Sequence, residues 1–141
     1  MQEYEMMNSP FLPPDATLGD STLDAVHGLI FDTLIRKREL PPETFPAAYD
    51  ELVKGMETDF RREEQLMESF PYPGAAQHRA QHARMLAGMH HAAAALMQGD
   101  CTPARRALAA LTDWFPIHIS TMDRYLLRAF REHQQAARTE T

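Results

Sequence analysis

The sequence predicts an all-α protein, an up-down-up-down four-helix bundle preceded by an irregular N-terminal arm. Apolar residues recur at helical spacing along four stretches of the 141 residues. Clusters of Pro, Gly and Asp separate these stretches by short connections, and the alternating pattern of β-strands is rare. Because short connections make successive helices antiparallel, four such helices favour an up-down-up-down bundle.

The length of the chain favours a single domain with a substantial core. We expect residues 1–20 to form the arm, residues 21–136 the bundle and residues 137–141 a C-terminal tail. Three prolines within the arm oppose helix there.

The first two helices are bounded by prolines and small polar residues. The first is expected over about residues 21–38, with Ser21 or Thr22 as its N-terminal cap. Two prolines then stop it, and Pro42 opens the second helix, expected over about residues 42–69.

The last two helices have equally clear start signals. The third is expected over residues 75–98, after a Pro-Tyr-Pro-Gly turn at residues 71–74. A Gly-Asp pair ends it. Thr102 then caps the fourth helix, with Pro103 at its first position.

Composition excludes several classes of protein. The formal net charge is −6 and no basic patch stands out, which disfavours nucleic acid as a partner. Apolar stretches are too short to span a membrane, and the acidic start does not resemble a signal peptide. Cys101 is the single cysteine, so no internal disulfide forms. We therefore expect a cytoplasmic protein.

Seven polar residues interrupt the apolar stripes, and every predicted helix carries at least one of them. Two pairs are spaced by four, which places both side chains on one helix face. A carboxylate buried without a counter-charge costs several kcal/mol, so a purely structural role is disfavoured for the whole set. The seven are His27, Asp59, Glu63, His78, His82, His118 and Asp123.

Metal ions would neutralise this set. The stripes supply no Lys or Arg against three carboxylates, whereas two divalent cations would supply four positive charges. Imidazole and carboxylate ligands suit iron, manganese or zinc, and the lack of thiolates disfavours a zinc–cysteine site. Cores of helix bundles commonly hold two-metal carboxylate sites.

The chain resembles the bacterial hemerythrins, a hemerythrin-like (HHE cation-binding) family, over about residues 18–130. The order, spacing and flanking aromatic residues of four segments all agree with that family. These segments are Asp24-Ala-Val-His27; Phe60-Arg-Arg-Glu63-Glu64-Gln-Leu-Met67; Tyr72-Pro with His78 and His82; and Trp114-Phe with His118, Ile119 and Asp123.

The resemblance implies a cofactor of two non-haem iron ions, bridged by an oxo or hydroxo group. Matched segment by segment, three histidines resemble the ligands of one iron, one histidine resembles a ligand of the other, and two carboxylates resemble bridges between them. These are His78, His82 and His118 for the first iron, His27 for the second, and Glu63 and Asp123 for the bridges.

The resemblance also implies a dioxygen-binding protein for carriage, storage or sensing rather than an enzyme. Phe60, Trp114 and Ile119 resemble the apolar lining of the dioxygen pocket, and they could also serve in ordinary core packing. No output domain is visible in the sequence, so a sensor would need a separate signalling partner.

Asp59 departs from the family pattern, which has a histidine there on the iron that binds dioxygen. An anionic ligand should favour ferric over ferrous iron, and this supports an alternative function, an enzyme-like di-iron site acting on oxygen, peroxide or nitric oxide. Asp59 could also fall short of the metal or turn outward. A metal-bound bundle with a structural or interaction role is a third possibility.

Two further expectations concern local geometry. His118 and Asp123 are five residues apart, so a local widening of the helix, with Pro116 contributing, would bring them into line. Glu64, like Arg61 and Arg62, is expected on a solvated helix face.

Overall fold

The computed structural model describes residues 12–139, so residues 1–11 of the predicted arm and 140–141 of the predicted tail lie outside the described part. Within it the chain forms a short 3₁₀ turn followed by four long helical segments, the last of which is continuous through a π-helical turn. The elements are η1 (Pro14–Ala16), α2 (Ser21–Lys37), α3 (Phe45–Glu68), α4 (Ala75–Met97), α5 (Thr102–His118), η2 (Ile119–Asp123) and α6 (Arg124–Thr139).

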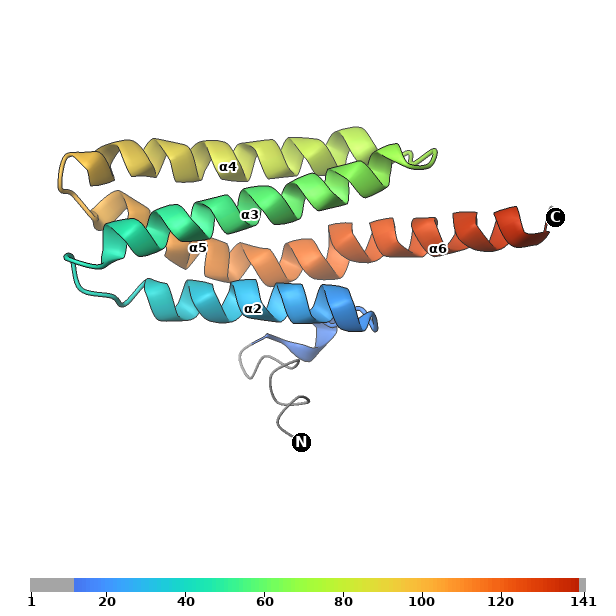
Figure 1. The fold of residues 1–141 in the computed structure, drawn as a ribbon, viewed down its shortest axis with the longest axis horizontal. Helices are drawn as coiled ribbons and strands as arrows, with labels where there is room; N and C mark the ends of the chain where they lie inside the picture. The colour runs from blue at the N-terminus through green and yellow to red at the C-terminus, as the bar shows by residue number, and fades with distance from the viewer. Residues whose placement is uncertain (1–11, 140–141) are drawn as a thin grey trace.

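The four long segments run antiparallel to one another, in the order up, down, up, down (Figure 1). Helices adjacent in the chain pack together, and α5 closes the ring by packing against α2. This arrangement confirms the predicted four-helix bundle. None of the helices within residues 12–139 is long and apolar enough to cross a lipid bilayer.

The last segment is longer than the sequence predicted. α5, η2 and α6 follow one another without a break, and α6 projects beyond the ends of the other helices (Figure 1). It reaches Thr139, past residue 136, where we expected the bundle to end. The division of the chain into arm, bundle and tail stays a prediction.

The N-terminal cap of α2 is Asp20, one residue before the expected Ser21 or Thr22. A side-chain oxygen of Asp20 accepts a hydrogen bond of 3.0 Å from the backbone N–H of Leu23. A carboxylate stabilises this end of the helix better than a hydroxyl, because its charge also complements the helix dipole.

Two other helix starts also differ from the prediction. α3 begins at Phe45 rather than Pro42, and Pro46 lies in its first turn, where a missing N–H costs little. α5 has no side-chain cap. Thr102 is its first residue, and the N–H of Thr102 bonds instead to Asp100 Oδ1 at 3.0 Å.

Among residues 12–139, the apolar core consists of two clusters that flank the polar residues. The larger fills most of the bundle, and the smaller lies towards the α3–α4 turn and α6. The clusters hold the surrounding helices in place, so the side chains between them have well-defined positions. The larger includes Leu34, Phe45, Tyr49, Met56, Met89 and Leu108; the smaller is formed by Met67, Phe70 and Leu126.

Candidate metal centre

The structure brings all seven polar residues predicted as ligands into one buried cluster. Each is between 0 and 6 % exposed. Because the residues on α3 and on α4 are spaced by four, each pair lies on one face of its helix and points into the bundle. α2 contributes His27, α3 contributes Asp59 and Glu63, α4 contributes His78 and His82, α5 contributes His118, and η2 contributes Asp123.

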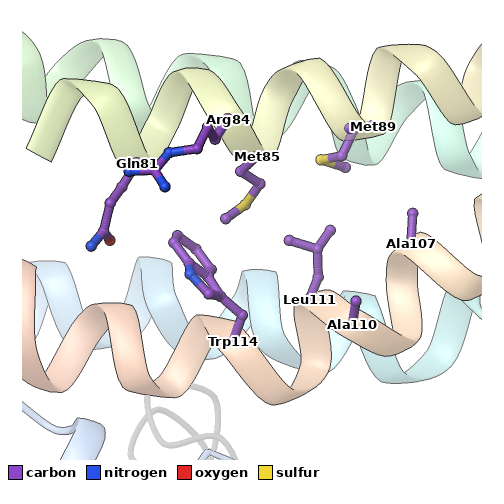
Figure 2. Close-up of a pocket in the computed structure, with 9 residues that line it drawn as sticks. Gln81, Arg84, Met85, Met89, Ala107, Ala110, Leu111 and Trp114 are labelled. Carbon is purple, nitrogen blue, oxygen red and sulfur yellow. The ribbon is translucent and has the colours of Figure 1, made fainter.

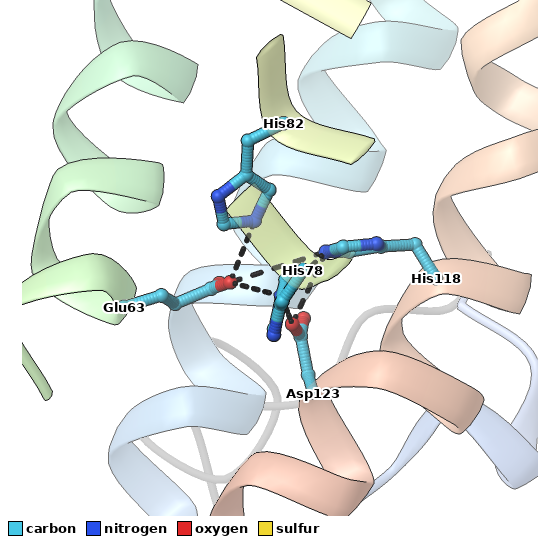
Figure 3. A group of neighbouring side chains, drawn as sticks. All are labelled: Glu63, His78, His82, His118 and Asp123. Carbon is cyan, nitrogen blue, oxygen red and sulfur yellow. Dashed lines mark hydrogen bonds and ion pairs between the residues drawn. The ribbon is translucent and has the colours of Figure 1, made fainter. Parts of the chain in front are cut away.

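Three histidines gather around two carboxylate oxygens at one side of the cluster (Figure 3). Glu63 Oε1 lies 3.0 Å from His82 Nε2 and 3.2 Å from His78 Nε2. Asp123 Oδ1 lies 3.1 Å from His78 Nε2 and 3.2 Å from His118 Nε2. All three rings therefore direct Nε2 at one shared space.

The other oxygens of the same two carboxylates face His27. Asp123 Oδ2 lies 3.3 Å from His27 Nε2, and Glu63 Oε2 lies 3.8 Å from it. Asp59 completes this second group, in which His27, Asp59 and Glu63 offer ligand atoms within 4.8 Å of one another. Glu63 and Asp123 thus each turn one oxygen towards each group, as a bridging carboxylate would.

The donor atoms of the cluster converge without satisfying one another, which is the condition that a bound cation would relieve. They approach to within ion-pair distance, but not along the directions that hydrogen bonds require. Buried polar atoms in this state are rare and costly. Among residues 12–139, the cluster atoms without a hydrogen bond include both oxygens of Glu63 and of Asp123, Nε2 of His27 and Nε2 of His82.

Without a bound cation, protonated histidines supply the positive charge that balances the carboxylates of this cluster. Burial by itself lowers the pKa of His27, but the adjoining carboxylates of Asp123 and Glu63 outweigh it and raise that pKa to about 10. The same balance raises the pKa of His118 to about 9. Burial raises the pKa of Glu63, yet the histidines around it hold that pKa well below its ordinary value. A metal ion would displace these protons.

The π-helical turn explains how Asp123 joins the cluster. η2 spans Ile119–Asp123, and the N–H of Arg124 bonds to the carbonyl of Ile119, five residues earlier. The wider turn brings His118 and Asp123 closer to one helix face than α-helical geometry would. Pro116 lies inside α5, just before the turn. The predicted widening of the helix is therefore confirmed.

Aromatic rings pack against three of the histidines. Phe60 stacks on His82 with ring centroids 3.9 Å apart, and Trp114 stacks on His118 at 4.4 Å. Phe115, which the sequence analysis missed, meets His27 edge to face at 5.9 Å. These rings shield the cluster from water.

A small cavity of about 20 Å³ adjoins the His27 side of the cluster. That volume is about enough for one water-sized molecule. Its walls are leucine side chains and three of the predicted ligands, and Phe60, Trp114 and Ile119 do not line it; a dioxygen pocket at those three residues stays a prediction. The cavity is lined by Leu23, His27, Glu63, Leu66, Asp123, Leu126 and Leu127.

Residues 18–130 match the Hemerythrin HHE cation binding domain. The chain belongs to the hemerythrin family. A bacteriohemerythrin from Ralstonia nicotianae (strain ATCC BAA-1114 / GMI1000) is 28% identical over 123 residues, which cover 87% of this chain and 90% of that protein. No solved structure matches the chain. A cation-binding family together with the buried cluster implies a metal-binding site and supports an iron- and oxygen-binding protein.

Asp59, which the resemblance marked as a departure from the family pattern, does not turn its side chain outward. It is 4 % exposed and lies in one group with His27 and Glu63. Burial, followed by the charge of Glu63, raises the pKa of Asp59 to about 7. Its Oδ2 has no hydrogen-bond partner among residues 12–139. The carboxylate is therefore positioned where a metal could use it.

Two polar residues outside the predicted set touch histidines of the cluster. Glu64 was expected on a solvated face, but its Oε2 lies 3.1 Å from His82 Nδ1. Gln81 Oε1 lies 3.0 Å from His118 Nδ1. The expectation for Glu64 was wrong because its side chain is only one-third exposed and faces α4. Gln81 directly precedes the second histidine of α4, which is the only signal that the sequence carries for it.

Proposed function

We propose that this chain is a non-haem di-iron protein that binds dioxygen, for carriage, storage or sensing. The observation that carries the proposal is the division of the carboxylate oxygens. Glu63 and Asp123 each face the three-histidine group with one oxygen and His27 with the other. A cluster built for one ion would not need two carboxylates turned towards two separate groups of ligands.

In this proposal different side chains bind each of the two irons. The three-histidine group would hold one ion, the other histidine and Asp59 would hold the second, and two carboxylates would contact both. Bound iron would supply the redox chemistry for taking up dioxygen. The residues are His78, His82 and His118 for the first ion, His27 and Asp59 for the second, and Glu63 and Asp123 for the bridges.

The surroundings of the second group support a small, uncharged ligand there. The cavity of about 20 Å³ reaches His27, and apolar side chains such as Leu66 and Leu126 form the rest of its wall. A site of this size and polarity favours a small, weakly polar molecule over larger polar substrates. Phe115 packs edge to face with the ring of His27 and helps to keep bulk water away.

A second candidate function rests on Asp59 alone. A buried carboxylate in place of a neutral imidazole adds negative charge beside the second ion, and negative charge favours the ferric state. A centre that oxidises readily suits turnover of oxygen, peroxide or nitric oxide better than reversible carriage.

Absorption spectroscopy distinguishes the two functions. We expect the reduced, iron-loaded protein to develop a visible absorption band on exposure to air and to lose it when argon replaces the air. The reason is that a buried, largely apolar site protects a bound gas from the water and protons that drive irreversible oxidation.

Zinc-loaded protein is the control, because zinc has no redox chemistry and should show no band. A spectrum that changes once and does not revert under argon would favour the second function. A reduced iron form that shows no change in air would contradict dioxygen binding altogether.

A further inference from the structure

Two hydrogen bonds fix the orientation of the outermost histidines of the three-histidine group. Glu64 Oε2 lies 3.1 Å from His82 Nδ1, and Gln81 Oε1 lies 3.0 Å from His118 Nδ1. A carboxylate or an amide oxygen can only accept a hydrogen bond, so each ring must donate through Nδ1–H. The lone pair of each Nε2 is then directed into the cluster, where Figure 3 shows both rings pointing towards Glu63.

The faces of the same two rings are fixed as well. Phe60 stacks on His82 with an angle of 4° between the rings, and Trp114 stacks on His118 with an angle of 19°. Each ring is therefore held at its outer edge by a hydrogen bond and on one face by an aromatic side chain. Little rotational freedom is left to lose when a metal binds.

The second group has no comparable support. Nδ1 of His27 and Oδ2 of Asp59 are buried and lack a hydrogen-bond partner within residues 12–139. Nδ1 of His78 also lacks one, so the outside hydrogen bonds support two of the three histidines in the first group and none of the residues in the second. Phe115 touches the ring of His27 edge to face rather than stacking on it. The ring of His27 is thus packed in place, but the tautomer that would present Nε2 to a metal is not fixed from outside.

We propose that Glu64 and Gln81 are positioning residues that preform the three-histidine group, so that this group takes up the first metal ion and the His27–Asp59 group the second. The inference rests on the proposed two-ion site and adds an order of filling to it. Hydrogen bonds from outside a metal site typically change metal affinity by about 10- to 100-fold. Glu64 is a carboxylate and therefore a stronger acceptor for Nδ1–H than a neutral amide oxygen.

Stepwise titration of the metal-free protein with Co²⁺ tests the proposal. The visible absorption bands of Co²⁺ report each ion as it binds, and the titration does not depend on oxygen chemistry. Wild type should bind in two steps. Glu64→Met and Gln81→Met should each weaken the first step by about 10- to 100-fold. Glu64→Gln and Gln81→Glu should retain most of the affinity, because each keeps an oxygen that accepts from Nδ1–H.

Matched controls separate positioning from loss of charge or of helix stability. Glu68 lies one turn after Glu64 on α3, pairs with Arg79 at 2.9 Å and touches no cluster histidine, so Glu68→Met removes the same charge nearby. Gln77→Met is an exposed substitution one turn before Gln81 on α4. Both controls should bind the first ion as wild type does. Gln81 lines a groove of about 410 Å³ between α4 and α5, so the Met and Glu side chains of its variants have room there (Figure 2).

The proposal would be overturned if Glu64→Met and Gln81→Met bound the first Co²⁺ ion as tightly as the controls do. It would also be overturned if these two variants lost only the second binding step. Absence of Co²⁺ binding to wild type would instead overturn the two-ion site itself. Circular dichroism of each metal-free variant checks folding, and if Glu64→Met does not fold, the Gln81 pair decides the outcome.

Discussion

Removing the metal ions is expected to lower the melting temperature of the protein by roughly 10 to 20 °C. Three carboxylates, those of Asp59, Glu63 and Asp123, are buried in one cluster, each 6 % exposed or less. A metal that binds only the folded state stabilises it, by about 4 kcal/mol at a concentration a thousand times the Kd. For a chain of this length each kcal/mol shifts the melting temperature by about 2 to 6 °C.

Thermal unfolding of iron-loaded, chelator-treated and zinc-reloaded protein measures this effect. Zinc should restore most of the loss, because the stabilisation comes from positive charge and coordination rather than from redox chemistry. A melting curve that stays unchanged after verified removal of metal would contradict a buried metal-binding cluster.

Asp59→His is expected to slow irreversible oxidation of the iron-loaded protein in air by about tenfold or more. The variant would place a neutral nitrogen donor where wild type has a carboxylate, four residues before Glu63 on the same helix face. One unit charge at about 4 Å is worth about 4 kcal/mol at an effective dielectric constant of 20. A third of that energy already corresponds to a tenfold change in rate.

Packing sets the main risk for this variant. Imidazole is larger than carboxylate, and the neighbouring Met56 and Phe60 are fully buried, so overpacking could cost about 1–3 kcal/mol. The oxidation rate should therefore be compared at equal iron content, with Asp50→His as a control. Asp50 pairs with Lys54 on the exposed face of α3. A variant that loads two irons yet oxidises as fast as wild type would show that Asp59 does not set the oxygen chemistry.

The sequence was most informative where polar residues occur at positions that helical periodicity places in the core. His118 and Asp123 are too far apart for one face of an α-helix, and the predicted widening is present as the π-turn η2. Polar residues inside apolar stripes also indicated a site, because burying polar groups without partners costs too much free energy to occur without a function. For that reason the bundle and all seven members of the buried cluster could be located before the structure was known.

Contacts between helices were harder to predict, because spacing along one helix does not say how a neighbour is rotated. Glu64 sits at the edge of the buried stripe of α3, and its partner His82 is eighteen residues later on α4. In sequence it looks like any other surface carboxylate. Trp114 and Phe115 are adjacent aromatic residues, and only the rotation of α5 decides which histidine each one contacts.

The number of iron ions per chain, measured by elemental analysis of protein produced with iron, tests the two-ion centre most directly. The expected result is close to two. Seven candidate ligand residues exceed what one octahedral ion needs, and Glu63 and Asp123 each face both groups. A single iron would contradict the second position at His27 and Asp59, and protein that holds only zinc or no metal would contradict the assignment to iron.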